Sequence, residues 1–256
     1  MIDTHSHIYS EEFDTDSAEV IQRAKDIGVQ HIILPNVDSE SLPRMLQLEA
    51  EYPDFCYACI GLHPTSVNAE YKNELKLVES ELERRKYLAI GEIGIDLYWD
   101  KSFLNEQVIV FQQQLEWALK YNLPVIIHVR NSFAETMEAM KPFLGKGLKG
   151  VFHSFTGTNH EAQEIINLGG FLLGINGIVT FKNSGLDKTL TNIDIQNIIL
   201  ETDSPYLTPV PFRGKRNESA YINIIAECVS GIYNLNKTEV IETTTRNAKI
   251  LFKNLG

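Results

Sequence analysis

The run VIIHV at residues 125–129 decides the fold, because it is almost continuously apolar and very short. An unbroken Val/Ile run is typical of a parallel strand covered on both faces, whereas a strand with one wet face alternates polar and apolar residues. The run is also far shorter than the roughly 18 apolar residues that a membrane helix needs. It therefore predicts a buried strand of a parallel sheet.

Similar runs recur along the whole chain and alternate with stretches of helical period. Between two of the runs, Val108, Phe111 and Leu115 step by three and four residues, as one face of an amphipathic helix does. Such a helix supplies the long crossover that parallel neighbours need. The predicted strands cover residues 1–7, 31–35, 57–62, 88–93, 125–129, 150–152, 170–175 and 197–200.

This alternation predicts an α/β fold, a TIM (β/α)8 barrel forming a single domain over residues 1–256. Residues 237–252 are expected to form an extra C-terminal helix, and residues 177–192 lack a clean period and are expected to form a loop. The alternative is a doubly wound open sheet, but the chain lacks the glycine-rich first turn of that fold. In a barrel, active sites are built at the C-terminal ends of the strands.

Composition limits the function classes that the chain can serve. With 43% hydrophobic and 22% charged residues it is an ordinary globular chain, neither disordered nor fibrous. Its net charge of −11 argues against sequence-independent coating of DNA, although bound cations could serve a nucleic-acid enzyme locally. Three cysteines cannot build a disulfide scaffold, and Cys56 and Cys59 are expected to be core thiols. With no basic-then-apolar leader in evidence, we expect a cytoplasmic protein without a membrane partner.

Histidines and carboxylates gather at the ends of the predicted strands. His5 and His7 are two residues apart in the first strand and should enter the barrel mouth from the same side. Glu92 follows an apolar run, where an unpaired carboxylate is costly. Six such groups are too many for one tetrahedral ion and suit two divalent ions, Zn, Mg or Mn, with shared ligands. The predicted metal ligands are His5, His7, Glu92, His128, His153 and Asp203.

Seven motifs in sequence order resemble the TatD-type metal-dependent deoxyribonuclease family. They are DTHSH (3–7), GLHP (61–64), GEIGID (91–96), IHVR (127–130), HSFTG (153–157), ETDSPYLTP (201–209) and RGKRN (213–217). The resemblance implies a TIM barrel of the metal-dependent hydrolase superfamily that releases nucleotides from DNA. It assigns one ion to His5, His7, Glu92 and Asp203, and the other to Glu92, His128 and His153. Tyr9 and Ser219 depart from the family pattern, which bears on loop shape and substrate choice.

The expected reaction is exonuclease-like hydrolysis of DNA phosphodiester bonds by a hydroxide held between the two ions. Asp203 is the expected proton acceptor, and Glu92 the carboxylate shared by both ions. We expect Glu201 to support a ligand from behind, and Asp96 either to do the same or to be a turn residue before the next helix. The expected partner is DNA, as single strands or ends, with the oligomeric state left open. The expected substrate-binding residues are His63, Arg130, Arg213 and Lys215.

Two other functions remain open from the sequence. The first is an amidohydrolase or lactonase on the same barrel, since an activated water attacks a carbonyl carbon equally well. No lysine ends the fourth strand, so a carbamylated-lysine bridge is not available to such an enzyme. The second is a metal-binding protein without activity. Tyr98 and Trp99 could stack on a base or merely cap the barrel.

Overall fold

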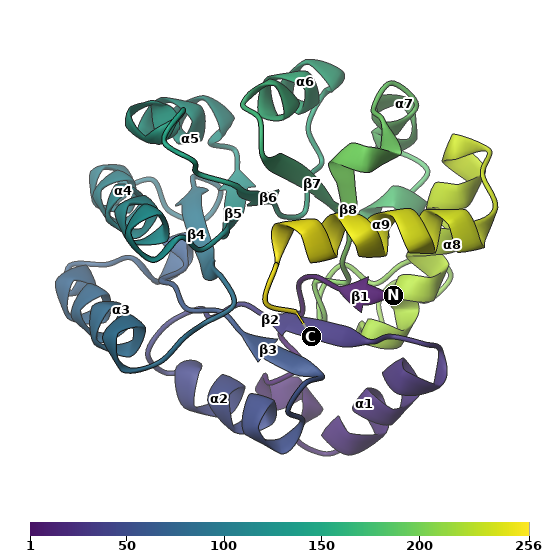
Figure 1. Ribbon diagram of the computed structural model, residues 1–256, viewed down its shortest axis with the longest axis horizontal. Helices are drawn as coiled ribbons and strands as arrows, with labels where there is room; N and C mark the ends of the chain where they lie inside the picture. The colour runs from purple at the N-terminus through teal and green to yellow at the C-terminus, as the bar shows by residue number, and fades with distance from the viewer. Residues whose placement is uncertain (256) are drawn as a thin grey trace.

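The computed structural model describes residues 1–255 and forms a ring of parallel strands surrounded by helices (Figure 1). The strands are β1 (Ile2–Asp3), β2 (His31–Leu34), β3 (Cys56–Ala58), β4 (Ile90–Asp96), β5 (Val125–Arg130), β6 (Gly150–Phe152), β7 (Phe171–Ile175) and β8 (Ile198–Leu200). They pair in the order β1-β2-β3 and β4-β5-β6-β7-β8. Single parallel bridges close the ring, one between Ile60 and Ile90 and one between Ser6 and Ser204. The predicted TIM barrel is confirmed.

The helices form the outer layer in Figure 1, except that α9 crosses one end of the barrel. They are α1 (Ser17–Asp26), α2 (Leu42–Glu51), α3 (Tyr71–Arg84), α4 (Leu104–Tyr121), α5 (Phe133–Met140), α6 (Asn159–Asn167), α7 (Leu186–Leu190), α8 (Ile222–Tyr233) and α9 (Lys237–Leu251). Local chemistry sets their ends. Thr158 and Glu161 form a reciprocal capping box at the start of α6, and Asn122 ends α4 in the left-handed conformation. None of the helices within residues 1–255 combines the length and apolarity needed to span a membrane.

The β5 run divides its side chains between two apolar clusters. Val125 and Ile127 pack in the large cluster shared with the surrounding helices. Ile126 joins a smaller cluster with Leu251 and Phe252 at the end of α9. The predicted C-terminal helix therefore closes one end of the barrel, which leaves the C-terminal ends of the strands for polar side chains.

Three details differ from the sequence expectations, and the first is that the third strand, predicted over residues 57–62, covers only Cys56–Ala58. Residues 177–192 are not simply a loop, because Gly177–Thr180 is a 3-10 helix and α7 follows it. Five residues are too few for α7 to reveal a helical period, and its Leu186 and Leu190 are buried by tertiary packing. The first strand is shorter than predicted. Beyond Asp3 the chain bonds alternately to both neighbours, Ser6 N donating to Ile33 O and His7 N to Ser204 O, as it turns into the mouth.

Candidate metal centre

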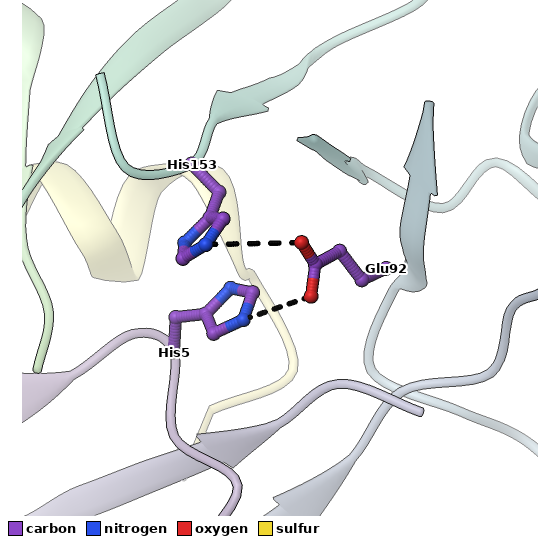
Figure 2. A group of neighbouring side chains, drawn as sticks. All are labelled: His5, Glu92 and His153. Carbon is purple, nitrogen blue, oxygen red and sulfur yellow. Dashed lines mark ion pairs between the residues drawn. The ribbon is translucent and has the colours of Figure 1, made fainter. Parts of the chain in front are cut away.

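All six predicted metal ligands meet at the C-terminal ends of the strands. Figure 2 draws His5, Glu92 and His153, which come from three different parts of the barrel and point toward one another. Five of the six are buried, and His128 is half-buried. Four of the ligands follow a strand: His5 and His7 follow β1, His153 follows β6 and Asp203 follows β8. The other two lie within strands, Glu92 in β4 and His128 in β5.

The Glu92 carboxylate lies at the middle of the group and offers one oxygen to each side. Its Oε2 is 3.1 Å from His5 Nε2 and 3.6 Å from His7 Nε2. Its Oε1 is 2.9 Å from His128 Nδ1 and 3.7 Å from His153 Nε2. A carboxylate in this position can serve two ions at once.

The Asp203 carboxylate approaches the same group from the β8 side. Its Oδ1 is 3.8 Å from the Nε2 atoms of both His5 and His7, and 3.7 Å from His153 Nε2. Its backbone adopts a positive φ of 58°, a conformation that aspartate tolerates better than most residues. Asp3 supports this turn, because its two carboxylate oxygens accept hydrogen bonds from Thr202 N (2.8 Å) and Thr202 Oγ1 (2.6 Å).

For three of the histidines, an outer partner determines which ring nitrogen faces the centre. His128 Nε2 lies 2.8 Å from Asp96 Oδ2, and His153 Nδ1 lies 2.9 Å from Glu201 Oε1. The Tyr9 hydroxyl donates to a backbone carbonyl, so it can only accept from His7 Nδ1, 2.9 Å away. Each outer contact leaves the opposite nitrogen directed at the centre, where it can offer its lone pair to a metal ion.

The chemistry of these inward-facing groups shows whether divalent ions fit the site. The inward nitrogens of His7, His128 and His153 and the oxygens of the carboxylates lie within 4 Å of one another. Such a group of acceptors is repulsive until protons or a metal cation lie among them. Imidazoles and carboxylates together suit first-row divalent metals. The side chains therefore fit metal ions, and three ligand sets could hold one: His5–Glu92–His153, His5–His7–Asp203 and His63–Glu92–His128.

The electrostatics of the centre favour a positive charge among these groups, carried by a proton or by a metal ion. Burial alone would raise the pKa of the Glu92 carboxyl, but the surrounding imidazoles hold that pKa well below its usual range. Burial opposes a charged His153, yet the neighbouring carboxylates raise its pKa to about 10. Burial also raises the pKa of Asp203 to about 6. The carboxylates thus create a negative potential that attracts cations.

The glycines around the site make room for its polar groups. A Cβ at Gly174 of β7 would overlap the Glu201 carboxylate, which is fully buried behind His153. A Cβ at Gly94 of β4 would overlap the backbone of His128, and this glycine has a φ of 147°. Ser154 N donates to Glu201 Oε1 at 2.6 Å, which fixes the carboxylate against its imidazole partner.

The predicted substrate-binding residues separate into two groups. His63 lies inside the centre, with its Nε2 3.3 Å from both Glu92 Oε1 and His128 Nδ1. Arg130, Arg213 and Lys215 are exposed and lie over aromatic rings rather than in the centre. The sequence position of His63, at a strand end in GLHP, could have marked it as a ligand candidate, as for the other histidines.

Comparison with known proteins decides the family. The family model described as "TatD related DNase" matches residues 2–253. The chain belongs to this family. This TatD-family chain is 38% identical over 254 residues to the uncharacterized metal-dependent hydrolase YabD of Bacillus subtilis strain 168, with 99% of both chains covered. It is therefore a metal-dependent hydrolase with buried clusters of metal-binding side chains.

Two further relatives bear on activity and fold. Over 259 residues the TatD-family chain is 30% identical to the 3′-5′ ssDNA/RNA exonuclease TatD of Yersinia pseudotuberculosis, with 99% of both covered. The crystal structure of YjjV, a TatD homologue from Escherichia coli K12, superposes with a TM-score of 0.92 at 30% identity. It covers 99% of this chain and 98% of that one.

Proposed function

We propose that this hydrolase is a two-metal exonuclease that removes nucleotides from the 3′ end of single-stranded DNA in the cytoplasm. The observation that carries the proposal is the Glu92 carboxylate, with an imidazole pair within 4 Å of each of its oxygens. A pair of ions sharing a carboxylate suits in-line displacement at phosphorus. The exonuclease named among the relatives supports the polarity and the single-stranded substrate.

The proposed ligands divide between the two ions along the Glu92 carboxylate. His5, His7 and Asp203 would hold one ion with Glu92, and His128 and His153 would hold the other, with His63 beside it. Divalent ions at this position polarise a phosphate oxygen and lower the pKa of water toward neutrality. Asp96, Glu201 and Tyr9 keep three of the imidazoles oriented, so the ligands need not reorganise during turnover.

Asp203 is the proposed proton acceptor of the reaction. Burial raises the pKa of its carboxyl to about 6, close to the operating pH at which a general base works best. It lies at the edge of the centre, and its Oδ1 is within 3.8 Å of imidazoles on both sides of Glu92. From there it can take a proton from water and pass it toward the leaving oxygen.

Substrate phosphates would be held by the exposed cations at the barrel mouth. Arg130, Arg213 and Lys215 carry no carboxylate partner within residues 1–255. Arg216, which the sequence places beside them, forms a bidentate ion pair with Asp16 and is already neutralised. In a chain of net charge −11, these few cations and the metal ions would supply the positive potential for DNA.

Digestion of end-labelled single strands tests the proposal. After metal reconstitution, 3′-labelled DNA should release labelled mononucleotide at once, while 5′-labelled DNA should shorten progressively. Chelation should abolish both. Internal fragments at early times would contradict the exonuclease, and hydrolysis of a lactone or cyclic amide without cleavage of either strand would establish the amidohydrolase alternative.

A further inference from the structure

An exposed aromatic pair lies at the rim of the barrel mouth, just beyond β4. Tyr98 is 53% exposed and Trp99 is 70% exposed, although large aromatic side chains are usually buried. Their rings meet edge to face, with centroids 5.0 Å apart. Trp99 belongs to none of the apolar clusters among residues 1–255, so packing of the core does not explain it.

A single carboxylate fixes this pair to the metal centre. Asp96 Oδ1 accepts hydrogen bonds from the backbone nitrogens of Tyr98 (2.9 Å) and Trp99 (3.3 Å). The other oxygen of the same carboxylate lies 2.8 Å from His128 Nε2. The aromatic pair is therefore held at a fixed position beside one of the proposed metal ligands, not on a free loop.

Arg130 completes the cluster with a cation that no carboxylate within residues 1–255 neutralises. Its guanidinium carbon lies 3.8 Å from the ring centroid of Tyr98 and 5.4 Å from that of Trp99. Its backbone is held beside β4, where Asp96 and Arg130 pair in register. Arg23 and Arg216 form ion pairs with carboxylates, whereas the Arg130 guanidinium has no such partner in the described part of the chain.

We propose that Tyr98, Trp99 and Arg130 form a nucleobase platform beside the metal centre. Trp99 stacks on the base of a nucleotide adjoining the scissile phosphate, and Arg130 binds a neighbouring phosphate. The inference rests on the proposed exonuclease function and adds to it the subsite that holds the strand. Because every base has a π-face, the platform accepts any sequence but requires a base. It also gives this acidic chain a hold on single strands that does not depend on many phosphate contacts.

A scan of abasic nucleotides tests the platform through the reaction. Single strands carrying one abasic position, moved stepwise from the 3′ end, are digested by wild type and by Trp99→Leu, Trp99→Phe and Ile250→Ala. Ile250 is an equally exposed apolar residue of α9, at the opposite end of the barrel. Wild type should slow about tenfold in kcat/KM at one abasic position. Trp99→Phe and Ile250→Ala should keep that dependence, and Trp99→Leu should lose most of it.

Equal abasic profiles for wild type and Trp99→Leu would overturn the platform while leaving the exonuclease intact. If wild type cleaves no single strand at all, the exonuclease proposal fails, and a binding measurement then decides about the platform.

This binding measurement uses tryptophan fluorescence. The chain has two tryptophans, and Trp117 is buried, so base stacking should quench mainly Trp99 fluorescence. Phosphorothioate oligothymidine should quench wild type but not Trp99→Phe. Equal quenching of both proteins, or of neither, would overturn the stacking role.

Discussion

Asp203 combines two roles that a single substitution can separate. As a metal ligand it is one carboxylate among several, so Asp203→Asn should retain most of the bound metal through its amide oxygen. As a proton acceptor it has no substitute, because an amide does not accept a proton at neutral pH. We expect kcat to fall at least about 100-fold, with a much smaller change in KM. The measurement is kcat, KM and metal content beside wild type. A loss of less than tenfold with metal retained would assign proton transfer to another group.

The residues of the centre were predictable because each histidine or carboxylate among them lies in or just after an apolar run of sequence. The sequence named Glu201 as a supporting group but could not tell which ligand each supporting group contacts, since that depends on contacts between distant segments. Asp96 had two open interpretations, and it does both things, contacting His128 and accepting the backbone hydrogen bonds of the turn after β4. In the sequence Tyr9 was only a departure from the family pattern, and the contact of its hydroxyl with His7 Nδ1 is visible only in the structure.

At the scale of the elements, β7 makes room for the centre at Gly174, where only a residue without a side chain fits. A Cβ there would overlap the fully buried Glu201 carboxylate and force it out of its present position. Gly174→Ala should cost about 1–3 kcal/mol of stability. Because the displaced Glu201 would release His153, metal affinity should fall about tenfold.

Gly231→Ala is the matched control for this substitution. Gly231 lies in α8 with open space where its Cβ would stand, so alanine should stabilise the helix by about 0.5–1 kcal/mol. Its metal affinity should equal that of wild type. Urea unfolding and metal titration of both variants give the result. Unchanged metal binding in Gly174→Ala would show that Glu201 does not support the ligand.

The loop after β8 is tied to α1 through Asp16, and this tie should depend on pH. Hydrogen bonds from Arg216 and Arg23 hold the pKa of the Asp16 carboxyl below its usual range. A lowered folded pKa contributes stability above the unfolded pKa of about 4, and this contribution is lost as pH falls through the folded value. Asp16→Asn should therefore destabilise by about 1 kcal/mol at pH 7 and by much less near pH 3. Urea unfolding at both pH values is the test, and equal differences at both would exclude the ion pair as the cause.

The elements were predictable to different degrees for a physical reason. Buried parallel strands such as β5 carry a short, nearly continuous run of Val and Ile, which is typical of a strand covered on both faces. The short helix α7 has no such signature, because five residues make little more than one turn and tertiary contacts stabilise it. The first strand was predicted to be longer than it is, because residues 4–7 form hydrogen bonds to two different neighbours instead of continuing the strand.

The whole molecule is acidic, so the cations in the loops near the barrel mouth should matter to a polyanionic substrate. Arg213 and Lys215 lie in the exposed loop after β8 without carboxylate partners among residues 1–255. Replacing both by alanine should raise KM for an oligonucleotide about tenfold and change kcat for a small phosphodiester much less. Steady-state kinetics on both substrates provide the comparison. Equal losses on the two would mean that these residues act on the scissile phosphate itself.

The central claim is that one carboxylate, Glu92, joins two metal ions into a phosphodiesterase centre. Metal content per chain and the rate of 3′-end release should be measured together as metal is added back to wild type and Glu92→Gln. For wild type we predict saturation near two ions, with most activity appearing with the second. For Glu92→Gln we predict no more than one tightly bound ion and a rate at least about 100-fold lower. Saturation of wild type at one ion, or two ions and a near-normal rate in Glu92→Gln, would contradict this account.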